Sequence, residues 1–525
     1  MSQPIYSTSV QIPVFSGLNQ SGDGYNKNMQ YAWEMENVSV EGGTFRPMRE
    51  GLRVEQELDY PIGTLAYLHR RYGQDTGTLL VAISNGKVFT KVLDEDDEWV
   101  EKYDGLTENN CDFVTYETSV FPLYEEKPYA VGDHCSREET VDEATVIKSY
   151  RCNTAIQTGG PWDASKWDDV TGSDPVDILL FTNAVDGMFC LYGDNQSVEK
   201  ITTPAKFGVI TRYNERIWGT GIIGDPDKLM YSVPFKPFDW RQNNDIPEDG
   251  AGDILQPTWD GDSFLALRQY GSTLLAVKRN SIWRIYGTNP GEFTMQQQYG
   301  GGTIEENTLC VYNDIAYMLG RNGIMRYDGT GAYPFLQSEI GKVMDQVNYS
   351  QLGKTCAGMR DKTYCVALPI NGSEFCNAIL EYNAQERSIS LRTNISVDSF
   401  LQIDERLFYT SATEPGRVFE LQDKIGMPLP CKWISCWQDL GLKNSIKSAF
   451  IAYMMVDSEA PVELWVGIRT EKKLKQKVLV TKPGKMSRIH LNLQGREFRL
   501  EIQSFSTVPF TISGGVRIDL ELDPD

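Results

Sequence analysis

The chain has 525 residues, of which 41% are hydrophobic and 11% aromatic, and no apolar run approaches the length of about 18 residues that a membrane-spanning helix needs. This composition is typical of a globular protein with an ample core and argues against a disordered or membrane-spanning chain. The formal net charge of −22 disfavours binding to a nucleic-acid backbone, because such binding depends on lysine and arginine neutralising phosphates.

The opening segment, residues 1–55, is polar and rich in glycine. Residues 1–20 lack the charged and then apolar order of a signal peptide, so we expect synthesis in a cytoplasm. Further on, residues 32–38, the Gly42-Gly43 turn and Phe45-Arg46-Pro47 predict a strand, a turn and a strand. We expect this segment to pack on the first of the repeated units that follow, or to close a ring of them.

A repeated pattern dominates the next 370 residues: an apolar alternating run, a short polar turn, and a second run rich in aromatic residues. Alternation with period two across a glycine or asparagine turn is the signature of a β-hairpin. About seven copies are visible, at 78–89, 178–193, 216–232, 273–287, 315–329, 365–383 and 406–421.

The spacing of these hairpins favours a β-propeller. Their starts lie roughly 40 to 60 residues apart, apart from one gap of about 100, and this interval suits one four-stranded blade. The alternative is a stack of β-sandwiches, which usually shows a tighter strand rhythm of 8 to 12 residues. The sequence therefore predicts an all-β protein with a propeller of about six or seven blades, the first of them within residues 1–123 and the others within 173–423.

The long gap holds a different kind of sequence, and we interpret residues 124–172 as a small inserted β module. Removing it restores a hairpin spacing of roughly 50 residues. The insert carries Cys135 and Cys152, which we expect to be neighbours. Exposed aromatic rings form sugar-binding platforms, although a small module also needs aromatic residues for its own core. The candidate carbohydrate-binding residues are Tyr129, Tyr150, Trp162 and Trp167, with Trp162 expected to be exposed and Tyr150 and Trp167 structural.

A linker with Gly426, Pro428 and Pro430 precedes a second region of strands, residues 431–525, for which we predict a β-sandwich. This region has 14 Lys and Arg against 11 Asp and Glu, a net charge of +3, which leaves about −25 for residues 1–430. Its basic loop is either a solvated hairpin tip or a docking contact for an acidic neighbour, through Lys472, Lys473, Lys475 and Lys477.

The sequence offers little for catalysis. The stretch from Gly219 to Gly224 matches a dinucleotide-binding motif, but a predicted strand follows it instead of the helix that the motif requires. Only three histidines occur, far apart, and no cysteine pair has the spacing of a zinc site. We therefore expect no catalytic residues, no metal and no cofactor, and we expect that the protein is not an enzyme. The 72 Asp and Glu leave a glycosidase as an alternative.

Two resemblances add to these predictions. The insert resembles the small chitin-binding type of carbohydrate-binding module at Tyr129, Gly132-Asp133, Tyr150-Arg151-Cys152, Pro161 and Trp167. The rest of the chain resembles the tail nozzle and packaged-DNA stabilisation proteins of short-tailed bacteriophages. The residues that carry this resemblance are Glu36-Asn37-Val38, Phe45-Arg46-Pro47, Ile285-Tyr286-Gly287 with Pro290 and Phe293, Gly323-Ile324, Tyr327-Asp328-Gly329 and Gly514-Gly515-Val516.

The second resemblance implies a structural protein of the virion, made in the host bacterial cytoplasm. Members of that family form a ring, usually sixfold, that closes the DNA channel and retains packaged DNA until infection. The implied partners are further copies of the chain, expected as a hexamer, and tail, adaptor or fibre proteins. A host glycan is a further expected partner, and DNA would pass the acidic surface without specific binding. The alternatives are a peripheral receptor-binding or glycan-degrading tail protein and a bacterial surface adhesin.

Overall fold

The structure, a computed structural model, describes residues 6–25, 28–54, 56–72, 76–141, 144–243, 245–480 and 484–523. These residues form 42 strands, one short α-helix and four 3-10 helices, which confirms the predicted all-β class. The helical segments are α1 (Gly341–Met344), η1 (Ala164–Lys166), η2 (Pro247–Asp249), η3 (Glu306–Thr308) and η4 (Tyr349–Lys354). None of them is long and apolar enough to span a membrane.

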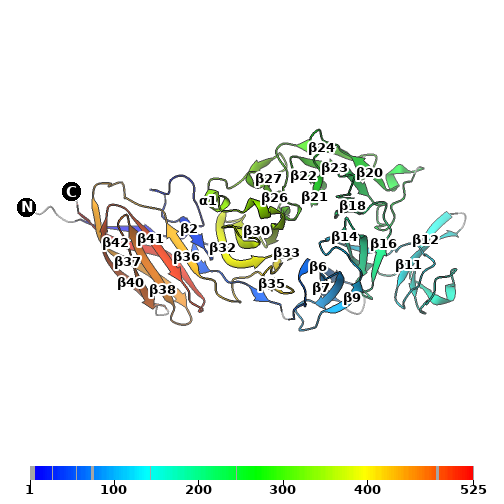
Figure 1. Ribbon diagram of the computed structural model, residues 1–525, viewed down its shortest axis with the longest axis horizontal. Coiled ribbons are helices and arrows are strands. Elements are labelled where there is room, and N and C mark those ends of the chain that lie inside the picture. Colours follow the sequence, from blue (N-terminus) through cyan, green and yellow to red (C-terminus); the bar gives the residue numbers. More distant parts are fainter. Residues whose placement is uncertain are drawn as a thin grey trace, which may run out of the picture. The chain divides into compact units, whose positions relative to one another are not determined.

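The chain divides into two compact units, one of residues 55–333 with 414–417, the other of residues 1–54, 334–413 and 418–525. Five antiparallel four-stranded sheets, blades 1 to 5, follow one another in the first unit (Figure 1).

Blade 1 contains β6 (Ile62–Arg70), β7 (Gly77–Ser84), β8 (Lys87–Val92) and β9 (Val100–Asp104). Blade 2 contains β10 (Asp112–Thr118), β14 (Val176–Asn183), β15 (Gly187–Tyr192) and β16 (Val198–Ile201). Blade 3 contains β17 (Val209–Tyr213), β18 (Arg216–Thr220), β19 (Lys228–Tyr231) and β20 (Gly252–Leu255). Blade 4 contains β21 (Phe264–Tyr270), β22 (Thr273–Lys278), β23 (Ile282–Tyr286) and β24 (Thr294–Gln298), and blade 5 contains β25 (Cys310–Tyr312), β26 (Ile315–Gly320), β27 (Gly323–Tyr327) and β28 (Ala332–Pro334).

Two more sheets of the same kind, blades 6 and 7, lie in the second unit. Blade 6 contains β29 (Cys356–Arg360), β30 (Thr363–Leu368), β31 (Cys376–Asn383) and β32 (Ser388–Val397). Blade 7 contains β33 (Ser399–Ile403), β34 (Arg406–Thr410), β35 (Val418–Glu420) and β5 (Leu52–Arg53). Seven successive four-stranded antiparallel sheets are the repeat of a β-propeller, which confirms the predicted fold class.

Each of the seven predicted hairpins forms the central pair of strands in one blade. The turn at Asn85-Gly86 shows why the pattern was readable. Both residues adopt left-handed backbone angles, with φ of 51° and 75°, as a two-residue hairpin turn requires. The outer strands were harder to predict, because they are partly exposed and have a mixed polar composition.

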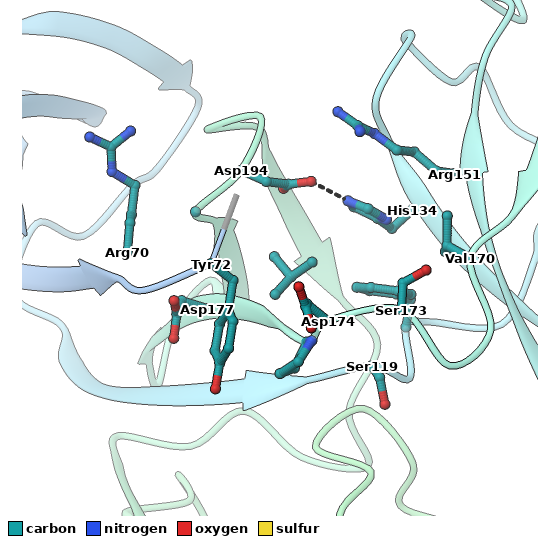
Figure 2. Close-up of a pocket in the computed structure, with 14 residues that line it drawn as sticks. Arg70, Tyr72, Ser119, His134, Arg151, Val170, Ser173, Asp174, Asp177 and Asp194 are labelled. Carbon is teal, nitrogen blue, oxygen red and sulfur yellow. Dashed lines mark hydrogen bonds and ion pairs between the residues drawn. The ribbon is translucent and has the colours of Figure 1, made fainter. Parts of the chain in front are cut away.

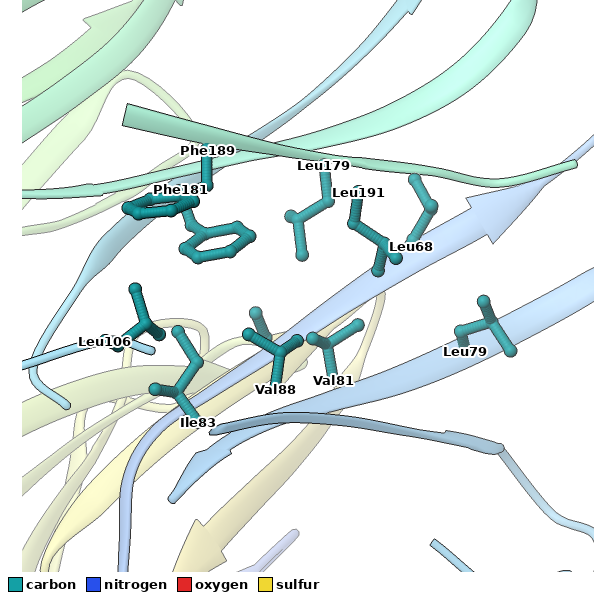
Figure 3. Close-up of a cluster of buried hydrophobic side chains, with 11 residues drawn as sticks. Leu68, Leu79, Val81, Ile83, Val88, Leu106, Leu179, Phe181, Phe189 and Leu191 are labelled. Carbon is teal, nitrogen blue, oxygen red and sulfur yellow. The ribbon is translucent and has the colours of Figure 1, made fainter. Parts of the chain in front are cut away.

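Neighbouring blades pack through alternate side chains of these central strands. In blade 2, Leu179, Phe181, Phe189 and Leu191 join the central strands of blade 1 in one buried cluster (Figure 3). The intervening residues of the same strands, such as Leu180, face blade 3 in a second cluster. Because successive side chains in a strand point to opposite faces, one apolar run serves two interfaces.

The insert forms a separate three-stranded sheet between β10 and β14, of β11 (His134–Val141), β12 (Ala144–Cys152) and β13 (Trp167–Asp169). This arrangement confirms the predicted small β module. Cys135 and Cys152 are free thiols in its core. Burial raises the pKa of Cys135 to about 12, so this thiol stays protonated at neutral pH.

The opening segment belongs to the second unit. It forms β1 (Tyr6–Ile12), β2 (Ala32–Glu36), β3 (Val38–Glu41) and β4 (Thr44–Pro47), and the predicted strand, turn and strand are therefore present. Of the two expected roles, packing on the first blade does not describe these strands, which pair with C-terminal strands, whereas a closing role fits the strand that follows them, because it completes the last blade. The segment then supplies β5, in which Leu52 and Arg53 pair with Glu420 and Phe419 of blade 7. No local sequence signal specifies these distant partners.

The C-terminal region is the predicted β-sandwich. One sheet has the order β3-β4-β42-β37-β40, with β1 added on β42, and the other has the order β2-β36-β41-β38-β39. Its C-terminal strands are β36 (Cys431–Ser435), β37 (Ile446–Ser458), β38 (Glu463–Thr470), β39 (Leu474–Val480), β40 (Met486–Gly495), β41 (Phe498–Ser504) and β42 (Phe510–Asp523). The six strands that the sequence predicts after residue 447 are all present, although Thr481, the predicted end of one, lies outside the described residues.

A buried ionic network links the opening segment to blades 6 and 7. Arg392, which is fully buried, donates from Nε to Glu381 at 2.7 Å and from a terminal nitrogen to Asp423 at 2.9 Å. It also donates to the backbone carbonyl of Arg49. Arg360 bridges the same two carboxylates, at 2.6 Å from Glu381 and 3.4 Å from Asp423. Although burial raises the pKa of Asp423, the two arginines hold it below its usual value.

We expect Leu179→Ala to destabilise the protein by about 2–5 kcal/mol, because the truncation leaves a cavity between blades 1 and 2. Chemical denaturation followed by tryptophan fluorescence measures the loss. Val185→Ala is the control, since Val185 is 49% exposed in the turn after the same strand and its truncation should change little. Equal effects of the two substitutions would contradict the packing described.

Candidate functional site

The junction between the insert and the propeller concentrates polar contacts. At its base, the Phe121 N–H donates to Ser136 Oγ at 2.8 Å, and Ser149 Oγ donates to the Ser119 carbonyl at 2.6 Å. Blade 2 also holds the insert, because Asn195 Nδ2 donates to the Gly132 carbonyl at 2.8 Å. These bonds fix the insert against the segment that follows β10 and against the turn between β15 and β16.

Blade 3 contributes a further contact to this junction. Arg241, in the segment between β19 and β20, forms an ion pair with Glu138 of the insert at 2.7 Å. Lys127 of the insert pairs with Glu199 of β16. The insert is therefore anchored to two neighbouring blades by charged contacts.

The four candidate carbohydrate-binding residues form the core of the insert. Tyr129, Tyr150 and Trp167 are buried, with exposed fractions of 5%, 8% and 5%. The prediction that Tyr150 and Trp167 are structural fits this burial. Their rings contact one another and Tyr124, so these residues hold the module together instead of presenting open faces to a sugar.

The prediction that Trp162 is exposed is wrong. Trp162 is partly buried, with Trp167 stacked against it at 5.2 Å and the Arg137 guanidinium 4.5 Å above its ring. Tyr150 meets it edge to face at 4.8 Å. Glycine and proline precede Trp162, which suggested an exposed turn, but the turn folds back over the small core. A stacking platform for sugars does not fit this position.

A cavity of about 300 Å³ lies at the junction of blade 1, blade 2 and the insert (Figure 2). Its lining includes charged groups of both signs, the rings of Tyr72 and Phe121, and the hydroxyls of Ser119 and Ser173. The charged and imidazole side chains are Arg70, His134, Arg151, Asp174, Asp177 and Asp194. Sequence analysis missed all of them, because they come from segments up to about 120 residues apart.

His134 is one of the side chains in the wall of this cavity. Its Nε2 lies 2.8 Å from Asp194 Oδ2, and its ring stacks on Phe121 with centroids 4.3 Å apart. Burial raises the pKa of Asp194, but the hydrogen bond and charge of His134, the Asn195 N–H and Arg151 outweigh it and leave the pKa below its usual value. His134 Nδ1 is buried with no hydrogen-bond partner among the described residues. Neither serine of the cavity is thus held by His134 as a nucleophile would be.

Asp177, which also lines the cavity, forms hydrogen bonds with an arginine. Its carboxylate accepts from the backbone N–H of Arg71 at 2.5 Å, and from Arg71 Nε and a terminal nitrogen at 3.0 and 2.6 Å. The same guanidinium contacts Glu117 at 2.7 Å. The hydrogen bond to Asp177 raises the pKa of Arg71 further. Two carboxylates of the cavity, Asp177 and Asp194, are therefore engaged in ion pairs within the fold.

Neither the dinucleotide-like motif nor the predicted docking lysines contribute to the lining of this cavity. Gly219 and Thr220 end β18, and the chain turns at Gly221 and enters β19, so a strand follows the motif as predicted. Lys472 and Lys473 are exposed at the tip between β38 and β39. Lys475 and Lys477 follow in β39, which lies at the edge of its sheet, and Lys475 Nζ donates to the Asn492 carbonyl at 2.9 Å.

No protein-family model and no curated protein matches this chain. Solved structures similar to it include BamB from Moraxella catarrhalis, with 9% identity, coverage of 80% of this chain and 98% of that chain, and a TM-score of 0.37. PorZ from Porphyromonas gingivalis has 10% identity, coverage of 89% and 72%, and a TM-score of 0.31. The Pan2 WD40 domain of Neurospora crassa has 9% identity, coverage of 70% and 91%, and a TM-score of 0.26. The propeller assignment is based on the seven sheets described above.

We expect Asp194→Asn to loosen the insert junction and to lower stability by about 1–3 kcal/mol at neutral pH, since it removes a charged hydrogen-bond acceptor. A carboxylate with a depressed pKa stabilises the fold above its unfolded pKa, and the contribution disappears as the pH falls through the folded value. The difference between wild type and Asp194→Asn should therefore shrink below about pH 4.

Thermal unfolding between pH 3 and pH 7 measures this dependence. Asp174→Asn is the matched control, because Asp174 lines the same cavity but is exposed and has no ion pair within the described part of the chain. A pH profile of Asp194→Asn parallel to that of the wild type would show that the contact contributes nothing.

Proposed function

We propose that this chain is a non-catalytic structural protein of a short-tailed bacteriophage virion. Several copies would form an axial ring, a nozzle or hub, that closes the DNA channel and retains or releases the packaged genome. The resemblance in the sequence motivates the phage assignment. The observation that best supports assembly is the division of charge, with about −25 on residues 1–430 and +3 on residues 431–525.

This charge division favours contacts between unlike ends of neighbouring copies. The basic residues of the sandwich include a hairpin tip, where Lys472 and Lys473 are exposed. Contacts between different surfaces on neighbouring copies produce closed rings when the rotation allows it. The acidic remainder of the chain would repel the phosphate backbone of DNA, which suits a conduit that DNA must pass without sticking.

The polar groups at the insert junction support a non-catalytic role. Asp177 pairs with Arg71, Asp194 pairs with His134, and Arg241 pairs with Glu138. Each pair connects different segments of the fold. We infer that the insert is an outward decoration on blades 2 and 3, facing fibres or the host surface.

The mass of the purified protein and its position in the particle test this proposal. Light scattering should give an assembly near six copies, and electron micrographs of the virion should place a sixfold ring on the tail axis. A monomer or trimer at the periphery of the tail would contradict the proposal. That outcome would instead favour a receptor-binding or glycan-degrading tail protein.

We expect the double substitution Lys472→Glu with Lys473→Glu to weaken self-association at least about tenfold at low salt, because it reverses the charge of the hairpin tip. Sedimentation velocity at two salt concentrations measures the effect. The control is Lys424→Glu with Lys443→Glu, which makes the same charge change at two other exposed positions of the second unit. Equal weakening by both pairs would indicate a general charge effect and would rule out docking through this tip.

A further inference from the structure

One tryptophan stands out on the surface of blade 3. Trp259, in the loop between β20 and β21, is 99% exposed. Two exposed aliphatic residues accompany it, Ile223 at 75% and Leu255 at 59%. Their loops are adjacent, because the Gln256 N–H donates to the Asp227 carbonyl at 3.0 Å. We call Ile223, Leu255 and Trp259 the Trp259 patch.

The loop that carries Trp259 is rigidly built. Lys278 is fully buried, and its Nζ donates to the backbone carbonyls of Gln256 and Asp262, both at 2.8 Å, on either side of Trp259. The same ammonium pairs with Asp227 of the neighbouring loop at 2.6 Å. A buried cation thus ties both loops together. Rigid display lowers the entropy cost of binding, and fully exposed tryptophan on a fixed loop is typical of an interface anchor.

The surroundings of the Trp259 patch are acidic. Asp253 and Asp225 share one cation, Lys228, at 3.6 and 3.9 Å. Asp260 accepts from Asn280 at 3.1 Å, and Asp262 accepts from the backbone N–H of the same residue at 2.6 Å. The two loops and their hydrogen-bonding neighbours carry five aspartates, at 225, 227, 253, 260 and 262, against Lys228, Lys278 and Arg279. The patch therefore fits an apolar surface with a basic border.

The sandwich of this chain carries such a surface. Met455 of β37 and Met486 of β40 are direct cross-strand partners, with exposed fractions of 37% and 64%. In the next row on the same face, Tyr453 pairs with Arg488 and with Arg517. The two guanidinium groups lie 5.6 and 4.5 Å from the centre of the Tyr453 ring. We call these five residues the Met486 patch.

The side chains of the two patches are chemically complementary. Methionine side chains adapt their conformation and make favourable sulfur contacts with aromatic rings, and arginine binds both aromatic faces and carboxylates. Arg488 forms no ion pair with any described residue, so it is available to an acidic partner. The Met486 patch is also distinct from the lysine tip, because it lies at the opposite end of β40 from Gly495, which adjoins Thr470.

We propose that Trp259 of one copy of this chain packs on the Met486 patch of a second copy, with Asp260 or its acidic neighbours facing Arg488. This inference deepens the proposed function and rests on it, since it names one interface of the assembly. The two surfaces differ, so the contact is heterologous and can repeat from copy to copy around a ring.

Trp259→Ala tests the proposal in the full-length chain. The residue is fully exposed, so the substitution should leave folding unchanged, which circular dichroism and the unfolding midpoint can establish. We expect the dissociation constant of self-association to rise at least about tenfold, as for loss of an interface anchor. The control is Phe235→Ala, which removes another aromatic ring, 65% exposed, from the other long loop of blade 3.

Charge exchange tests the pairing of the two patches. Asp260→Lys and Arg488→Glu should each weaken association, and the double variant Asp260→Lys with Arg488→Glu should regain at least part of it. A photo-crosslinking residue at position 259 should label segments 453–458 or 486–490 of another copy. Labelling of a different segment would overturn the proposed interface.

The outcomes separate this inference from the function on which it rests. A wild-type chain that stays monomeric at all concentrations and appears singly in the particle would overturn both. If the wild type assembles and Trp259→Ala assembles equally well, the interface is wrong while the ring proposal stands. Selective weakening by Trp259→Ala, together with rescue by the charge exchange, supports the interface.

Discussion

The first of the two central strands in each blade is buried on both faces, and the rest of the propeller depends on this constraint. In β15 and β22 every residue is buried. A single blade cannot bury both faces of such strands, because each face needs a neighbouring sheet to exclude water. Alternate residues therefore pack on opposite neighbours. Leu274 and Ala276 of β22 face blade 3, and Leu275 and Val277 face blade 5. Blades 6 and 7 share a cluster of the same kind.

The second unit depends on contacts between the two ends of the chain. The opening segment gives strands to both sheets of the sandwich and β5 to blade 7. Phe45 of β4 and Trp433 of β36 meet around Phe15, with ring centroids 5.5 and 5.1 Å from it. A buried ionic network favours one specific arrangement of these segments, because an unpaired buried charge is costly. The network consists of Arg360, Arg392, Glu381 and Asp423.

The surface of the molecule has two kinds of feature: ion pairs around the insert, and exposed apolar side chains elsewhere. Three ion pairs attach the insert to blades 2 and 3: His134 with Asp194, Lys127 with Glu199, and Glu138 with Arg241. By contrast, Trp259 and Met486 are exposed at 99% and 64%, although apolar exposure of this size costs free energy in water. The ion pairs at the insert junction hold parts of the fold together, whereas Trp259 and Met486 belong to the two surfaces through which we propose that copies of the chain associate. Self-association would cover both apolar surfaces.

The sequence by itself determined the local elements. Seven hairpins, the insert and six strands of the sandwich were readable, because alternation and turn residues act over fewer than about 20 residues. Only the tertiary structure decided which distant segments meet. The partners of the opening strands, the contact of His134 with Asp194 and the burial of Trp162 depend on residues far along the chain or on how a turn folds back. Trp259 illustrates the same limit. The sequence shows a tryptophan beside Asp260-Gly261-Asp262, but its exposure and the anchoring of its loop by the buried Lys278 are visible only in the structure.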